Sequence, residues 1–353
     1  MKNKCRSVMV ALLLLICLPL LGSCNRMRKS EPEQVFLVSA VGFDADGEEI
    51  RLTLELPVIA SDGEMKKPTV LSASGETVEA ALGKITARLG KELLFSHCAL
   101  MALGEELSRE RLEEAFGFVE TGNYLPLACE VVATGNAERL LKSSSLSSVA
   151  AGYEISEIYK RERELLGLRL QSEVYAICSS ENPERQILLP WFEVSDDEAA
   201  SFCGLRILRA DAPAVSVGRD DCVAYAVLSG HFEGGNGKVG QMPGVALERV
   251  STRLSAELSE ERLHLTVSIL ARASENRSTE ELRALQERIE QACEALFYRL
   301  QVNAGGDVFY FLERLKKENG VLKAALEGNG EALLANAVLS VYCQIEERGI
   351  GVP

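Results

Sequence analysis

The stretch VFLVSAVGFDADGEEIRLTLEL, residues 35–56, predicts a β-hairpin from its side-chain pattern. Residues 35–43 are almost wholly apolar on both faces, as expected for a buried strand. Residues 50–56 alternate large apolar side chains with polar ones, as expected for a strand with one wet face. Between them, residues 44–47 (DADG) carry the turn signal of a hairpin. The two aspartates could also suggest calcium, but the further ligands and distal glutamate of an EF-hand are missing, which favours the turn.

The segments that follow this hairpin alternate between strand and helix patterns. Apolar runs predict strands at residues 69–73, 95–103 and 127–134. Helical spacing of apolar residues predicts helices at 78–89 and 112–119. Strands separated by helices of this length indicate an α/β or α+β unit with helices on its sheet. We therefore predict an N-terminal α+β domain over residues 35–145, which ends in the serine-rich stretch KSSSLSS.

The next part of the chain predicts a helical linker and a small middle domain, residues 146–238. A charged helix at 150–166 is followed by strand candidates at 186–194 and 204–209. The segment ends in GHFEGGNGK, residues 230–238, which lacks the glycine and lysine spacing of a phosphate-binding loop. An ordinary interdomain turn is the favoured interpretation.

The last part predicts a C-terminal α+β domain, residues 239–353. Two strands, at 251–258 and 263–271, precede a helix that begins with the capping box Ser278 and Glu281. A further helical stretch and a closing strand, at 308–317 and 337–345, give the order β-β-α-α-β. The fold class predicted for the whole chain is α+β and multi-domain, with mixed sheets each covered by helices.

The N-terminus has the pattern of a targeting segment. Residues 1–7 carry three cations, and residues 8–21 are almost wholly apolar, too short for the about 20 residues of a membrane-spanning helix. Leu21-Gly22-Ser23-Cys24 resembles the lipobox of bacterial lipoproteins, in which the cysteine receives a diacylglycerol and the chain is cut before it. We expect a lipoprotein signal peptide at 1–23, a lipid on Cys24 that holds the chain on a bilayer, and a tether at 24–34. The alternative is an ordinary signal cleavage site with an incidental cysteine.

Charge argues against nucleic acid as a partner. The chain has a formal net charge of −14, and loss of residues 1–23 would leave 35 Lys and Arg against 52 Asp and Glu. A surface this acidic repels a phosphate backbone.

The residues that most often carry metal sites and catalysis are scattered. Besides Cys24, the cysteines after the targeting segment show no C-x-x-C spacing, which favours buried free thiols over a metal site: Cys98, Cys129, Cys178, Cys203, Cys222, Cys293 and Cys343. The three histidines, His97, His231 and His264, lie far apart in sequence, with no nucleophile motif beside them. We therefore assign no catalytic residue, metal or cofactor, and predict that the protein is not an enzyme.

Residues 95–107, FSHCALMALGEEL, resemble the F-x-H-x-(apolar)-G-E-E-L block of the Ger(x)C spore germination proteins. These are the lipoprotein C subunits of germinant receptors. Other similarities occur in the same order along the chain: the lipobox at Cys24, the VGFD element at 41–44, Asp307 after the long helix, and IEERGI at 345–350.

The resemblance implies a three-domain α+β lipoprotein on the outer face of the inner membrane of a spore. It would assemble with integral membrane subunits of the A and B types, respond with them to nutrients, and have no enzymatic activity. Within the resembling block, Phe95, His97, Gly104 and Glu105 are the candidate partner-contact residues. The rival hypotheses are a solute-binding lipoprotein of a transporter and an extracytoplasmic hydrolase.

Overall fold

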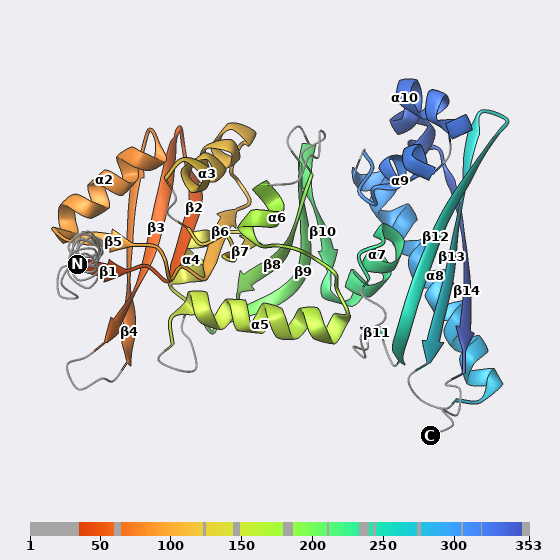
Figure 1. The fold of residues 1–353 in the computed structure, drawn as a ribbon, viewed down its shortest axis with the longest axis horizontal. Coiled ribbons are helices and arrows are strands. Elements are labelled where there is room, and N and C mark those ends of the chain that lie inside the picture. Colours follow the sequence, from red (N-terminus) through yellow and green to blue (C-terminus); the bar gives the residue numbers. More distant parts are fainter. Residues whose placement is uncertain are drawn as a thin grey trace, which may run out of the picture. The chain divides into compact units, whose positions relative to one another are not determined.

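The computed structural model describes residues 35–59, 65–122, 125–143, 149–178, 186–209, 212–232, 240–242, 245–273, 277–304, 306–318 and 320–347 (Figure 1). From Leu37 onward the described residues form one compact unit. The predicted signal peptide, the tether and Cys24 lie outside the described residues.

The predicted hairpin is present. Strands β2 (Ala40–Asp46) and β3 (Glu49–Ile59) pair antiparallel, and the turn begins at Gly47, which has the left-handed φ of 64° that glycine tolerates. The predicted first strand is broken, because β1 (Val35–Leu37) ends before Val38 and Ser39.

The prediction of a wet face on the second strand is wrong in its middle. Thr53 and Glu55 are fully buried, because helices cover this face of the sheet as well as the leucine face. Period-2 alternation marks two different faces but does not say that the polar one meets water.

The hairpin is the centre of an eight-stranded mixed sheet with the order β10-β9-β8-β7-β6-β2-β3-β4. The strands β2, β6, β7 and β8 are parallel neighbours, and the pairs on either side of them are antiparallel. The further strands are β4 (Met65–Gly75), β6 (Leu100–Gly104), β7 (Glu130–Thr134), β8 (Ile187–Val194), β9 (Ala200–Arg209) and β10 (Ala212–Gly218). The sheet thus continues across the predicted domain boundary between residues 145 and 146.

The helices of this part have bounds close to those predicted where the pattern is amphipathic. They are α2 (Val78–Leu89), α3 (Arg109–Gly122), α4 (Ala137–Leu141), α5 (Ala151–Leu166) and α6 (Val174–Cys178). In α2, Thr77 caps the N-terminus by accepting from the Ala80 N–H at 3.2 Å, and Gly90 ends the helix with a φ of 63°. The predicted strand at 95–103 is wrong in its first half: the Cys98 N–H donates to the Phe95 carbonyl in a turn, and β5 (Glu92–Leu94) precedes it.

The C-terminal sheet has the order β11-β12-β13-β14. Its strands are β11 (Gly240–Met242), β12 (Val245–Ser259), β13 (Arg262–Ala273) and β14 (Val338–Glu346). Because β13 and β14 are parallel, the chain must cross over between them, and it does so through α8 (Thr279–Ala304), α9 (Phe311–Glu318) and α10 (Gly320–Ala335). The predicted capping box is confirmed: the Ser278 N–H donates to Glu281 Oε2 at 2.8 Å, and the Glu281 N–H donates to Ser278 Oγ at 3.3 Å.

Helix α7 (Cys222–Ser229) follows β10 and the short 3₁₀ helix η3 (Arg219–Asp221), and every one of its residues is buried. The Tyr225 hydroxyl donates to the Val308 carbonyl at 2.8 Å. The Phe309 ring packs against Tyr225, Phe297 and Phe311 at centroid distances of 5.4–5.8 Å. This aromatic group joins α7, α8 and the start of α9 into one core.

The turn of the β12–β13 hairpin gives a testable prediction about stability. Glu260 and Glu261 both have positive φ, 51° and 60°, which is the conformation of a two-residue type I′ turn. Because non-glycine residues are strained in this region, the double change Glu260→Asn and Glu261→Gly should raise the free energy of unfolding by about 1–2 kcal/mol. Urea unfolding would measure it, with Glu257→Asn on the neighbouring strand as a control that should bring no gain. Equal stability of the turn variant and the parent would contradict the strain argument.

Candidate functional site

The four candidate contact residues do not gather on one surface. Phe95 is 4% exposed and packs edge-on against Phe118 at 6.0 Å. His97 is exposed in the turn before β6, where its carbonyl accepts from the Tyr153 hydroxyl at 3.0 Å. Gly104 is the last residue of β6, and Glu105 follows it. The strand β6 therefore separates the histidine end of the block from the glutamate end, and of the four candidate residues only His97 and Glu105 are exposed.

Glu105 joins the first part of the chain to β9. Its carboxylate pairs with the Arg206 guanidinium, which also lies 5.3 Å from the centre of the Trp191 ring. The Trp191 Nε1–H donates to Glu193 Oε1 at 2.6 Å, and the same oxygen accepts from the Gly135 N–H at 3.0 Å. These contacts fix the ends of β6, β7 and β8 relative to β9.

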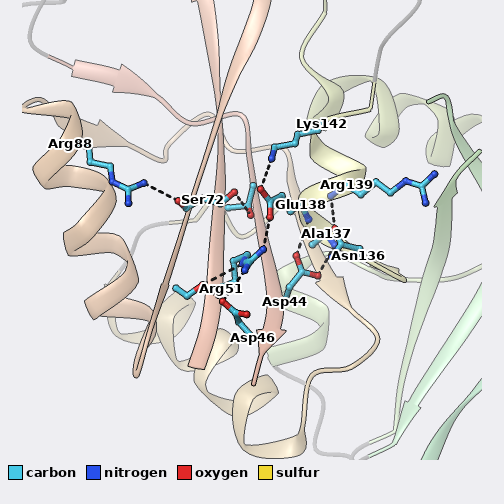
Figure 2. A network of polar contacts seen from close by, with 12 residues as sticks. Asp44, Asp46, Arg51, Ser72, Arg88, Asn136, Ala137, Glu138, Arg139 and Lys142 are labelled. Atoms are coloured by element: carbon cyan, nitrogen blue, oxygen red, sulfur yellow. Dashed lines mark hydrogen bonds and ion pairs between the residues drawn. The ribbon is translucent and has the colours of Figure 1, made fainter. Parts of the chain in front are cut away.

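A second polar group lies at the ends of the parallel strands, and Figure 2 shows it from close by. Asp44 on β2 is 5% exposed, and its two carboxylate oxygens accept from the N–H groups of Ala137 and Glu138 at 2.7 and 2.9 Å. Asn136 caps the same helix by accepting from the Arg139 N–H at 2.7 Å. Burial raises the pKa of Asp44, and the two backbone hydrogen bonds only partly offset that rise.

Arg51 on β3 forms hydrogen bonds with two further acids near Asp44 and with Ser74 on the neighbouring strand β4. Its guanidinium donates to Asp46 at 2.9 Å and to Glu138 at 3.0 Å (Figure 2). Ser74 on β4 donates to Asp46 as well. Hydrogen bonds from Ser74 and Arg51 lower the pKa of Asp46. For Glu138 burial acts in the opposite direction, but hydrogen bonds from Lys142, Ser72 and Arg51 outweigh it and lower the pKa.

The position of Asp44 leaves no room for a side chain at residue 104, so this residue must be glycine. A Cβ on Gly104 would lie well inside van der Waals contact of Asp44 Oδ1 and 3.1 Å from the Phe43 carbonyl oxygen. The glycine of the resembling block and the aspartate of the VGFD element are thus two halves of one contact.

Glu55 on β3 repeats the arrangement at a second helix. It is fully buried, and its oxygens accept from the N–H groups of Ala151 and Gly152 at 2.6 and 2.9 Å and from the Ser39 hydroxyl at 2.8 Å. Gly152 allows the close approach, because a Cβ there would lie 2.7 Å from the Ala40 Cβ. The two strands of the first hairpin therefore each supply a buried acid to the first turn of a helix, α4 or α5.

The contacts of Asp44 affect whether an anionic ligand could bind at the carboxyl ends of the parallel strands. In open α/β sheets a ligand anion usually binds outside the carboxyl ends of parallel strands, where helix N–H groups face it. Here the Asp44 carboxylate already accepts from the first N–H groups of α4. The position of an anionic ligand is taken by the protein's own side chain, and the acids serve to hold the helices on the sheet.

The remaining sequence candidates are also placed. Five of the seven later cysteines are buried as predicted, while Cys178 is exposed and Cys203 is partly exposed, and none of the seven forms a disulfide with another described residue. Burial raises the pKa of Cys222 and of Cys343 to about 12. His264 lies exposed on β13, and His231 follows α7. Within the described residues no group of three or more His, Cys, Asp or Glu side chains is placed to hold a metal ion.

Among the residues that the structure describes, no helix combines the length and the apolar character needed to cross a bilayer.

Residues 28–194 match the family model described as the spore germination protein N-terminal domain. This part of the chain therefore belongs to the family of spore germination protein N-terminal domains. The matched range contains the hairpin, the Asp44 and Glu55 contacts and the whole of the F-x-H block.

The crystal structure of the GerBC protein has the same fold. It matches 87% of this chain and 96% of its own, with a TM-score of 0.51 and 12% sequence identity. At this identity the likeness speaks for the fold, and it confirms the predicted multi-domain α+β class. No curated protein matches the chain.

Proposed function

We propose that the chain is the lipid-anchored C subunit of a nutrient germinant receptor, held on the outer face of the spore's inner membrane. The family match over residues 28–194 is the observation that carries this proposal. The lipobox pattern Leu21-Gly22-Ser23-Cys24 supports the anchor, because a diacylated cysteine gives stable attachment to a bilayer. Attachment confines the chain beside its integral membrane partners and so raises its effective concentration there.

We further propose that the subunit acts by contact with other proteins and not by catalysis. Two buried acids of the first sheet, Asp44 and Glu55, accept hydrogen bonds from helix N–H groups and are thereby engaged in holding the fold. Of the four candidate contact residues, His97 and Glu105 are exposed and so able to meet a partner, one at each end of β6.

The anchor gives the first test of this function. The change Cys24→Ser should abolish lipidation, move the chain from the membrane fraction to the soluble fraction, and remove the added mass of the lipid. Spores in which this variant replaces the natural chain should lose the nutrient response to the same extent as spores that lack the gene. Membrane fractionation, mass spectrometry and germination assays measure the three effects.

Cys178→Ser is the matched control, because Cys178 is an exposed cysteine of the folded part. It should leave lipidation and germination unchanged. A Cys24→Ser chain that stays in the membrane fraction and supports full germination would overturn the proposed anchor.

The contact surface gives a second test. If His97 and Glu105 meet partner subunits, the change His97→Ala should reduce co-purification of the integral membrane subunits without changing the stability of the chain, because the side chain of His97 is exposed. His264→Ala, at an exposed position of β13, is the control. Unaltered co-purification and germination for the His97→Ala variant would remove this end of β6 from the contact surface.

A further inference from the structure

A cavity of about 770 Å³ lies apart from the Asp44 and Glu55 contacts. It opens between the segment that follows α5, the start of β8 and the first turns of α9. Its charged lining consists of Arg169, Arg314, Lys317 and Glu313, with His231 among them. Apolar side chains, among them Leu170, Ile177 and Leu188, form another part of the wall.

The charge of this cavity is opposite to that of the chain. Among the described residues that line it, three cations face a single acid, in a protein whose formal net charge is −14. The acid, Glu313, already pairs with Lys317 at 2.6 Å. Arg314 is held in place by donating to the Leu228 carbonyl at 2.6 Å. Arg169 has no carboxylate partner among the described residues, so the cavity keeps a positive potential that would attract an anion.

The hydrogen bonds around His231 assign its tautomer. The Ser229 hydroxyl donates its single proton to the Tyr225 carbonyl at 2.8 Å. The same hydroxyl oxygen lies 2.9 Å from His231 Nδ1, so Nδ1 must carry a proton and donate it. In the neutral ring Nε2 is then an acceptor, and it becomes a second donor when the ring is protonated.

Tyr310, which lines the cavity, has a strained backbone conformation. Tyr310 has a positive φ of 58°, and its ring lies 5.6 Å from the ring of His231. Asp307 fixes the segment by accepting from the N–H groups of Phe311 and Leu312 at 2.9 and 2.6 Å. A non-glycine residue in this conformation persists only where its surroundings impose it, and such strain is concentrated at functional sites.

We propose that this cavity binds a small organic anion, whose carboxylate or phosphate group faces Arg169, Arg314 and Lys317 and whose apolar body packs beside Tyr310. Convergent cations over an apolar wall are the general design of pockets that take such ligands. None of the described residues that line the cavity belongs to the block at 95–107, and the inference does not depend on the receptor function.

Protonation of His231 should accompany binding. Burial lowers the pKa of His231, and the charges of Arg314 and Arg169 lower it further. Of the other groups that line the cavity, Lys317 adds positive charge, Glu313 offsets it, and Tyr310 is neutral. A bound anion would offset the guanidinium charges and raise the pKa of His231, so binding should take up a proton and become tighter as the pH falls.

The test is calorimetry on the purified full-length protein at about pH 8 and about pH 6, the range in which histidine titrates. Phenyl phosphate and benzoate are the probes that distinguish recognition of a phosphate from recognition of a carboxylate. Inorganic phosphate, which has no apolar ring, tests whether the apolar wall contributes to binding. Phenol, which has no anionic group, tests whether the cations are needed. At least one of the two aromatic anions should bind, tighter at the lower pH. Inorganic phosphate should bind more weakly and phenol not at all.

Variants assign the binding to this cavity. Arg169→Gln and Lys317→Gln should each weaken binding about tenfold or more, whereas Arg283→Gln, at an exposed position of α8, should not change it. His231→Gln should reduce the pH dependence, and thermal melting of each variant shows that the fold is kept. Absence of binding by both aromatic anions at millimolar concentration, or equal affinities of the parent and the Arg169→Gln variant, would overturn the proposal. Either result would leave the receptor proposal intact, because spores are not part of this test.

Discussion

Replacing Gly104 with alanine should lower the free energy of unfolding by about 2–4 kcal/mol. The new Cβ would overlap Asp44 Oδ1 and press on the Phe43 carbonyl oxygen at 3.1 Å. Asp44 cannot simply turn aside, because its carboxylate accepts from the N–H groups of Ala137 and Glu138. The variant must therefore either lose these hydrogen bonds or separate β6 from β2. Urea unfolding followed by circular dichroism measures the change.

Two further variants make the cause visible. Gly83→Ala is the control, because nothing lies within 4 Å of a Cβ at this helical glycine, and it should stabilise by about 0.5–1 kcal/mol. In the background of Asp44→Ala, the change Gly104→Ala should cost much less than it does alone, since the oxygen that it strikes is gone. Additive costs of the two changes would show that the overlap with Asp44 is not the reason for the glycine.

The sequence was sufficient where a local pattern carried the information. The DADG turn, the stripe of α2 and the Ser278–Glu281 capping box depend on residues within a few positions of one another, and all are present. Helix α7 escaped prediction because it is buried on every side and so has no amphipathic period. Helix α10 escaped because Gly328, Asn329 and Gly330 interrupt it, and Asn329 has non-helical dihedral angles.

The buried acid contacts could not be predicted from the sequence, because their partners are remote along the chain. The Asp44 and Glu55 carboxylates accept from residues 93 to 97 positions away. In an alternating strand, the position of Glu55 is indistinguishable from that of a solvated glutamate until helix α5 is placed over it. The family block did contain a signal, since a glycine after an apolar strand indicates close approach of another chain segment. The sequence does not identify that segment.

Glu55→Gln should destabilise the protein about as much as Gly104→Ala does, lowering the free energy of unfolding by about 3 kcal/mol near neutral pH. Glutamine has the same size, but its amide NH₂ replaces one acceptor oxygen. That NH₂ would face the Ala151 N–H, the Gly152 N–H or the Ser39 hydroxyl, so a buried donor would be left without an acceptor at the start of α5. Glu257→Gln on the exposed face of β12 is the matched control and should change stability by less than about 0.5 kcal/mol.

The pH dependence separates the charge of Glu55 from its packing. Burial raises the pKa of Glu55 above the ordinary value of 4.5, and the hydrogen bonds from Gly152, Ser39 and Ala151 only partly offset the rise. At a pH between 4.5 and the folded pKa, the folded protein therefore holds a proton on Glu55 that the unfolded chain has released. The contribution of this protonation to stability is complete below pH 4.5 and is lost as the pH rises through the folded pKa. The titration of His231 changes stability in the opposite direction, because its lowered pKa means that the folded protein favours the neutral ring. The difference between the parent and the Glu55→Gln variant cancels that effect, and it should be larger at about pH 5 than at about pH 7. A difference that stays constant over this range would mean that Glu55 holds α5 without changing its protonation.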